Sequence, residues 1–283
     1  MADSSWAADV SPSPGVPKPD PTLVVEDVRR SFGGLVAVDV DKLQVQRGSI
    51  TALIGPNGAG KTTLFNLLTG FDQPDSGDWA FDGVDLQGKP AHAIARSGMV
   101  RTFQLTKTLS RMTVLDNMRM AAPHQQGERL SQALLPPRWR ARERELEARA
   151  LQTLERFRLR EMHDEYAATL SGGQRKLLEM ARAVMTEPRL VLLDEPVAGV
   201  NPVLKQALLD HVRELRAEDT TVLFVEHDMD VVMGISDWIV CMAEGRVISE
   251  GRPRQVAADP AVVDAYLGTH RSDQSGSATG EPS

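Results

Sequence analysis

The run GPNGAGKTT at residues 55–63 constrains the fold of this chain more than any other feature. It matches the pattern G-x-x-x-x-G-K-[ST], in which glycines let backbone N–H groups close around phosphate oxygens. The pattern is meaningful between a buried strand and the start of a helix. The apolar run SITALIG (49–55) precedes it, and TTLFNLLTG (62–70), with helical spacing, follows it. The sequence therefore predicts an α/β fold with a phosphate-binding loop at the end of a strand.

Short β-branched runs alternate with amphipathic segments along most of the chain. TLVVEDVRRSF (22–32) and VDVDKLQV (38–45) are typical of an N-terminal antiparallel β layer, whereas the later alternation of strands and helices predicts a mostly parallel sheet covered on both faces. We expect one domain over residues 22–270, with a helical subdomain at about 106–185.

The composition limits which kinds of protein this chain can be. Residues 1–21 and 271–283 are rich in Ser, Pro, Asp and Gly, which predicts a disordered tail at each end. No apolar run approaches the roughly 18 residues that a membrane span needs. The net charge of −7 argues against a nucleic-acid partner, and the single cysteine, Cys241, fits a reducing cytosol. These features together predict a soluble cytoplasmic protein.

A second run, RLVLLDE, supplies the carboxylates that a phosphate site needs. Four apolar residues bury the predicted strand and bring Asp194 to its carboxyl end, where open α/β sheets bind ligands. Next to phosphates, Asp194 and the Thr62 hydroxyl are suited to Mg²⁺, and Glu195 is placed to polarise a water. Two adjacent carboxylates beside a phosphate would repel it without the ion, so the pair implies Mg²⁺.

The turn LSGGQ (170–174) is a second glycine-rich helix start that could bind an anion. Together with GPNGAGKT, LVLLDEP and the HD of FVEHD, it resembles the nucleotide-binding subunit of an ABC transporter over about residues 22–268. The resemblance implies a P-loop NTPase cassette with a RecA-like parallel-sheet core, the antiparallel layer and the helical subdomain. It also implies that two cassettes, in a homo- or heterodimer, sandwich two ATP molecules head to tail, so that one subunit's phosphate loop faces the other's SGGQ turn.

The same resemblance implies roles for individual positions. Phe32 matches the aromatic residue that stacks on adenine, and His227 matches the histidine that contacts the γ-phosphate. Gln104 matches the glutamine that senses Mg²⁺ and water, takes part in catalysis and couples to the membrane domain. Glu195 becomes the catalytic carboxylate. ATP contacts are implied for Gly55, Pro56, Asn57, Gly58, Ala59, Gly60, Lys61, Thr62 and Thr63, Mg²⁺ contacts for Thr62, Gln104 and Asp194, and contacts to the partner's ATP for Ser171, Gly172, Gly173 and Gln174.

One position departs from the family pattern. Asn201, in the loop AGVNP, stands where an Asp commonly crosses the dimer interface, which puts a charged contact there in doubt.

Less specific sequence features indicate which branch of the family the chain resembles. RTFQ, AGVNP, EHDMDVV and the ending DAYLG resemble the subunits of branched-chain amino acid importers, although lipopolysaccharide-export ATPases share parts of the pattern. Two further classes are alternatives to a transporter subunit. The single cassette argues against a soluble ABC ATPase of DNA repair or translation, and intact Lys61, Asp194, Glu195 and His227 argue against a cassette that binds ATP without turnover. A transporter subunit implies an integral membrane permease docked at residues 105–120, a substrate-binding protein, and a peripheral location at the cytoplasmic face of the membrane.

Overall fold

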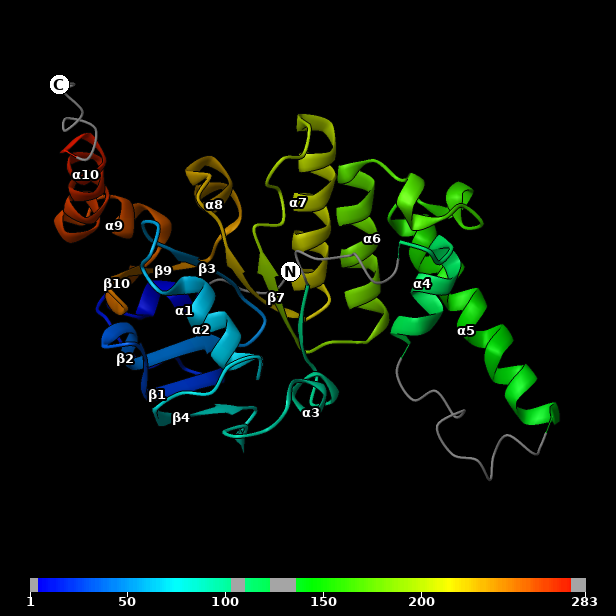
Figure 1. Ribbon diagram of the computed structural model, residues 1–283, viewed down its shortest axis with the longest axis horizontal. Helices are drawn as coiled ribbons and strands as arrows, with labels where there is room; N and C mark the ends of the chain where they lie inside the picture. The colour runs from blue at the N-terminus through cyan, green and yellow to red at the C-terminus, as the bar shows by residue number, and fades with distance from the viewer. Residues whose placement is uncertain (1–4, 103–109, 123–135, 276–283) are drawn as a thin grey trace, which may run out of the picture.

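The computed structural model describes residues 5–102, 110–122 and 136–275. Within these residues the larger of two sheets has the strand order β10-β9-β3-β8-β7-β6 (Figure 1). Neighbours from β9 to β6 pair in parallel, and β10 pairs antiparallel with β9 at one edge. Strands β3 and β8 are buried along their whole length because helices or the second sheet cover both faces. The strands are β3 (Ile50–Ile54), β6 (Met99–Arg101), β7 (Leu190–Asp194), β8 (Thr221–Val225), β9 (Trp238–Ala243) and β10 (Arg246–Gly251).

The smaller sheet is antiparallel and has the order β2-β1-β4-β5 among the described residues. Its strands are β1 (Pro21–Phe32), β2 (Leu35–Gln46), β4 (Ser76–Phe81) and β5 (Val84–Asp85). Helix α2 (Lys61–Leu68) lies between the two sheets, and its buried face, including Leu64 and Phe65, shares one apolar cluster with both. This arrangement fixes the helix that follows the phosphate loop from two sides.

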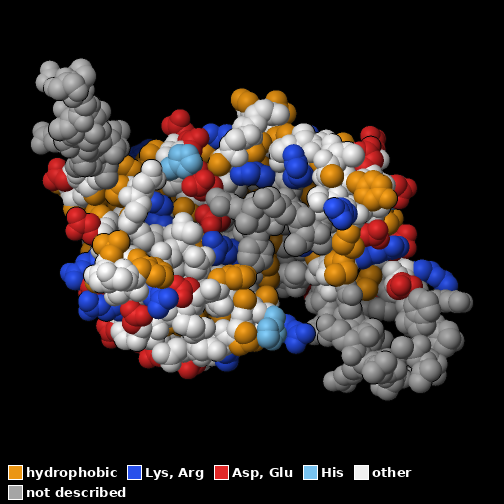
Figure 2. All heavy atoms as spheres, viewed as in Figure 1, with side chains coloured by type: hydrophobic (Ala, Val, Ile, Leu, Met, Phe, Trp, Pro, Cys, Tyr) orange, Lys and Arg blue, Asp and Glu red, His pale blue; other side chains and the backbone are white. Residues whose placement is uncertain are grey.

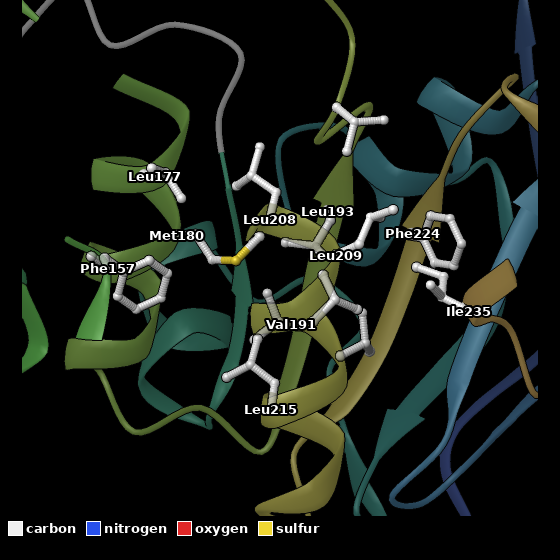
Figure 3. Packing of buried hydrophobic residues seen from close by; sticks show 14 of the residues in the cluster. Phe157, Leu177, Met180, Val191, Leu193, Leu208, Leu209, Leu215, Phe224 and Ile235 are labelled. Atoms are coloured by element: carbon white, nitrogen blue, oxygen red, sulfur yellow. The ribbon is translucent and has the colours of Figure 1, made fainter. Parts of the chain in front are cut away.

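Helices cover the other face of the larger sheet. Figure 3 shows Leu208, Leu209 and Leu215 of α7 against Val191 and Leu193 of β7, with Met180 of α6 beside them. Apart from α1 (Trp6–Asp9) and α2, the helices of the described residues on either face are α3 (Ala91–Arg96), α4 (Val114–Ala121), α5 (Pro136–Arg156), α6 (Gly172–Met185), α7 (Pro202–Ala217), α8 (Met229–Ile235), α9 (Pro253–Ala257) and α10 (Pro260–Ser275), with 3-10 turns at Arg160–Met162 and Ala167–Thr169.

Helices α4, α5 and α6 pack on one another at one side of the molecule (Figure 1). Helix α4 begins after Thr113, whose hydroxyl caps the helix by accepting a hydrogen bond from the Asp116 N–H at 3.1 Å. In the described part of the chain, no helix is both long enough and apolar enough to cross a membrane.

The N-terminal segment differs from its prediction. Residues 5–20 are packed rather than disordered: α1 (Trp6–Asp9) buries Ala7, and the Trp6 ring lies 5.4 Å from that of Trp238. Lys18 is fully buried and forms a 2.8 Å ion pair with Glu250 of β10. The segment is polar on average, but these few side chains meet partners from distant parts of the chain. At the other end, α10 continues to Ser275, past the predicted start of the C-terminal tail.

Candidate nucleotide-binding site

The phosphate-loop motif connects β3 to α2, as the sequence predicts. Its glycines are required by the backbone and by close neighbours: Gly55, Gly58 and Gly60 all have positive φ. A Cβ atom at Gly55 would lie 2.1 Å from the Met242 carbonyl oxygen, and one at Gly60 would lie 2.2 Å from that of Ala37. The loop therefore holds its curved shape through the packing of β2 and β9 around it.

Lys61 opens α2 and folds back into this loop. Its ammonium donates hydrogen bonds to the carbonyl oxygens of Gly55 at 2.7 Å and Pro56 at 2.9 Å. Burial lowers the pKa of Lys61, although the carboxylates of Glu195 and Asp194 oppose that shift. Because the first-turn N–H groups of a helix lack intrahelical partners, the amides of residues 61–63 and the lysine together form a cationic, donor-rich cradle for an anion.

The ends of three neighbouring parallel strands bring the other predicted residues to the same edge. Strand β8 lies between β3 and β7, and Asp194 at the end of β7 pairs with Val225 at the end of β8. His227 is the second residue after β8, and its Nδ1 lies 3.7 Å from a carboxylate oxygen of Glu195. Both side chains are open to solvent, at 67% and 36% exposure. Figure 2 shows acidic, basic and histidine side chains close together on the upper part of the face it draws.

Glu195 has an unusual backbone. Its φ is +47°, in the left-handed region that costs a residue with a side chain about 1 kcal/mol or more. Its N–H donates to the Val225 carbonyl oxygen at 3.0 Å, and its own carbonyl oxygen accepts from Lys176 Nζ at 2.7 Å. Such strain persists where neighbouring groups hold it, and it is common at functional sites.

Asp194 has a partner that the motifs do not reveal. Arg101, at the end of β6, donates to its carboxylate at 2.6 Å and to the Asn66 side-chain oxygen at 2.7 Å. The side chains of Arg101 and Asp194 are only 9% and 7% exposed. The motif RTFQ indicates a role for its glutamine but none for Arg101, whose partners lie on β7 and α2.

The donor set suits Mg²⁺. Thr62 and Asp194 offer hard oxygen ligands, and within the described ranges no cluster of three or more His, Cys, Asp or Glu residues could hold a metal by itself. Few protein ligands beside phosphate oxygens are typical of Mg²⁺ in nucleotide sites. Gln104, the third predicted ligand, lies outside the described residues.

Phe32 ends β1 with its ring on the surface. The residue is 47% exposed, so it is no part of a core. The Arg30 guanidinium carbon lies 4.7 Å from the centre of the ring, and Arg30 is itself held by Asp72 and Asp75. An exposed aromatic face of this kind is suited to stacking on a base.

The SGGQ turn begins α6 with a complete capping box. The Ser171 hydroxyl accepts from the Gln174 N–H at 3.3 Å, and the Gln174 side-chain oxygen accepts from the Ser171 N–H at 2.9 Å. A Cβ atom at Gly173 would meet Leu204 of α7 at 2.4 Å, whereas one at Gly172 would meet no described atom within 4 Å. Gly172 is therefore exposed, with open space where a side chain would be. In Figure 1, α6 and α2 lie on opposite sides of β7, so the two glycine-rich turns belong to separate parts of the subunit.

Asn201 and Glu226 lie in the segments that follow β7 and β8. The Asn201 side-chain oxygen caps α7 by accepting from the Leu204 N–H at 3.0 Å. Glu226, 1% exposed, accepts from the N–H groups of Val197 at 3.1 Å and His227 at 3.3 Å. Glu226 thus connects the segment after β8 to the segment after β7. In the sequence, only its position immediately before the HD pair indicates that it lies near the site.

Family models match two parts of the chain. The model described as ABC transporter matches residues 38–198, and the model described as branched-chain amino acid ATP-binding cassette transporter matches residues 246–272.

Curated relatives match nearly end to end. The probable branched-chain amino acid transport ATP-binding protein LivG of Archaeoglobus fulgidus is 43% identical over 89% of this chain and 97% of its own length. The high-affinity branched-chain amino acid transport ATP-binding protein BraF of Pseudomonas aeruginosa is 44% identical over 88% and 98%. The corresponding LivG protein of Escherichia coli K12 is 43% identical over 88% and 98%.

Solved structures agree with the fold. A nucleotide-free ATP-binding cassette from an ABC transporter has a TM-score of 0.76 at 38% identity and covers 87% of this chain and 98% of its own. An ATP-binding cassette of an ABC transporter in its ADP conformation has a TM-score of 0.75 at 37% identity and covers 88% of this chain and 99% of its own. The predicted cassette fold is confirmed, with its parallel core, antiparallel layer and helices. The chain belongs to the ATP-binding subunits of ABC transporters, in the branch of the LivG and BraF proteins, and is an ATPase.

Proposed function

We propose that this ATPase powers the import of branched-chain or related amino acids, working as a head-to-tail dimer beneath a membrane permease. The observation that carries the proposal is the gathering of the phosphate loop, Asp194, Glu195 and His227 at one sheet edge, in a chain whose relatives are named for branched-chain amino acid transport. The SGGQ turn, on the far side of β7, is left for the second subunit's ATP.

Each residue at the sheet edge has a role in this proposal. The loop amides and Lys61 bind the phosphates, and Phe32 stacks on adenine. Thr62, Asp194 and Gln104 hold Mg²⁺, which when bound neutralises charge on the phosphates. Glu195 accepts a hydrogen bond from a water and orients it for in-line attack on the γ-phosphorus, while His227 donates to a γ-phosphate oxygen.

The second subunit completes each site. Ser171 is already fixed by the capping box, and Gly172 faces open space, so the start of α6 can approach an ATP from outside the chain. The helix dipole and the amides of residues 172–174 then meet the γ-phosphate. Asn201 faces the partner as a helix cap, with its N–H₂ group available for a neutral hydrogen bond.

In this proposal the permease docks on the side of the molecule that carries α4, α5 and α6. Residues 105–120 follow Gln104, and the described part of them ends with Met120 on α4, which is 57% exposed. A substrate-binding protein delivers the amino acid to the permease on the opposite side of the membrane, and the cassettes remain peripheral at the cytoplasmic face.

The variant Glu195→Gln tests the role of the site. It keeps the shape of the side chain but removes the base, so ATP should bind with unchanged affinity, dimers should accumulate in sedimentation, and hydrolysis should fall by about 100-fold or more. Glu161→Gln, an exposed carboxylate of a 3-10 turn, is the control. Hydrolysis at the wild-type rate in Glu195→Gln contradicts the assignment.

Transport is tested separately on the complex purified with its permease and binding protein. A panel of amino acids is added, and ATP hydrolysis is measured with each. Leucine, isoleucine or valine should stimulate hydrolysis above the basal rate. Stimulation by none of the amino acids contradicts amino-acid import while leaving the ATPase assignment intact.

A further inference from the structure

Lys176 joins the SGGQ helix to Glu195 within one subunit. Its Nζ donates a 2.7 Å hydrogen bond to the backbone carbonyl oxygen of Glu195. Lys176 lies in the second turn of α6, whose first turn carries Gly172 and the capping box. The element that is proposed to touch the partner's ATP is thus connected to the carboxylate that is proposed to act on the subunit's own ATP.

The backbone of Glu195 depends on this contact. Its left-handed conformation, with φ of +47°, requires neighbours to hold it. The N–H is held by the Val225 carbonyl oxygen of β8, and the carbonyl oxygen is held by Lys176. Because the side chain of Glu195 leaves the same Cα atom, a rotation of this peptide changes where the carboxylate points.

The hydrogen bond from Lys176 to Glu195 lies beside a cavity between α6 and β7. A cavity of about 190 Å³ separates the start of α6 from the end of β7, and its lining includes Gly172, Lys176, Asp194 and Pro196. Further from the site, Met180 of α6 packs towards Leu208 of α7 (Figure 3). At the strand end, the hydrogen bond from Lys176 links α6 directly to the backbone of Glu195.

The surrounding charges favour this geometry. Burial lowers the pKa of Lys176, and the carboxylates of Glu179, Glu226, Glu195 and Asp194 oppose that shift. The buried Glu226 also accepts a hydrogen bond from the Val197 N–H. The segment 195–197 is therefore held by a cation from α6 and by an anion that follows β8.

We propose that Lys176 is a positioning residue that makes the orientation of Glu195 depend on the position of α6 in the same subunit. The inference rests on the proposed function, because the dimer and the role of Glu195 belong to it. When the partner's ATP draws in the start of α6, Lys176 carries that movement to Glu195, which acts on the other ATP of the dimer. The two sites thereby sense each other's occupancy.

Homodimers provide the first test. Lys176→Met nearly keeps the length of the side chain but removes the hydrogen-bond donor. Because a misplaced catalytic group slows the reaction, kcat should fall by about 100-fold, while KM for ATP stays within about threefold of the wild-type value. Lys176→Arg, which restores a cationic donor, should recover much of kcat. Arg213→Met removes an exposed cation from α7 and is the control. An unchanged kcat in Lys176→Met overturns the proposal, as does equal loss in the Met and Arg variants.

Mixed dimers purified with two different tags test whether Lys176 acts within its own subunit. Single-turnover hydrolysis is compared with that of a wild-type/Glu195→Gln dimer, which has one intact site. With Lys176→Met and Glu195→Gln in one chain and a wild-type partner, the working Glu195 keeps its own Lys176, and the reference rate should persist. With the two substitutions on different chains, the working Glu195 has lost its lysine, and hydrolysis should fall by about 100-fold.

The opposite pattern means that Lys176 acts through the SGGQ turn on the partner's ATP, and it overturns the proposal. Loss in both arrangements indicates a damaged subunit and also overturns it. A reference dimer that forms but hydrolyses no ATP points to a failure of the proposed shared site itself.

Discussion

At the scale of residues, a buried ion pair lies beside the phosphate loop. Arg101 and Asp194 are almost fully buried, and Arg101 also holds Asn66 of α2. The pair therefore fixes Asp194 to the helix that follows the phosphate loop. Removal of one partner from a buried pair leaves an uncompensated charge, which costs far more than the loss of an exposed pair.

Arg101→Met should lower the free energy of unfolding by about 3 kcal/mol, measured by urea denaturation without nucleotide. Mg²⁺ with ADP should recover more stability in the variant than in the wild type, because the ion then neutralises Asp194. The control is Arg160→Met, whose partner Glu155 is exposed and whose loss should cost less than about 0.5 kcal/mol. A loss in Arg101→Met no larger than the control's contradicts this account.

At the scale of elements, the N-terminal segment joins the edges of both sheets. Lys18 donates its N–H to the Gln44 side chain of β2 at 2.8 Å, while its ammonium pairs with Glu250 of β10 and lies 4.4 Å from the ring of Trp238. Glu250 also accepts from Trp238 Nε1 and the Val16 N–H. The N-terminal segment thus covers a buried polar network formed by Lys18, Glu250 and Trp238.

Lys18→Met should destabilise the protein by about 3 kcal/mol, since Glu250 keeps its charge without its counter-ion. Glu250→Gln in the same chain should restore part of that loss, because no buried charge then remains. Lys42→Met, which removes a half-exposed pair with Glu26, is the control and should change stability by less than about 0.5 kcal/mol. Urea denaturation of the wild type, the two single variants and the double variant measures the free energy of unfolding of each. Equal losses of stability in Lys18→Met and Lys42→Met would contradict a stabilising role for the buried Lys18–Glu250 pair.

At the scale of the whole molecule, Asp82 ties the two sheets together. It follows β4 and accepts hydrogen bonds from the Thr22 hydroxyl of β1 at 2.7 Å and from Arg47 at 2.8 Å, and it pairs with Arg189 just before β7. Burial opposes its charge, but these donors and the cations outweigh burial, so the pKa of Asp82 lies below its ordinary value.

The sign of the resulting pH dependence follows from that lowered pKa. The carboxylate stabilises the fold fully above the ordinary carboxyl pKa of about 4, and this stabilisation is lost as pH falls through the lower folded value. Asp82→Asn should cost about 1 kcal/mol at pH 7. The difference from the wild type should shrink below about pH 4 in chemical denaturation over a pH series. A difference that stays constant across the series argues against a role for the charge.

Much of the fold and site could be predicted because the signals are local. The phosphate loop needs glycines where φ is positive, and RLVLLD needs only burial to become a strand that ends on Asp194. The N-terminal segment was predicted wrongly because composition averages over it, while its order depends on a few side chains, among them Trp6 and Lys18, that meet Trp238 and Glu250.

The sequence by itself determined the cassette, its phosphate loop and the residues at the strand ends, because motif spacing and strand–helix alternation act over short distances. Only the tertiary structure decided that Arg101 holds Asp194 and that Lys176 holds the carbonyl group of Glu195. Those contacts join groups far apart along the chain or on different elements. They form because strand order and helix packing place buried charges within hydrogen-bond distance, which no local pattern encodes.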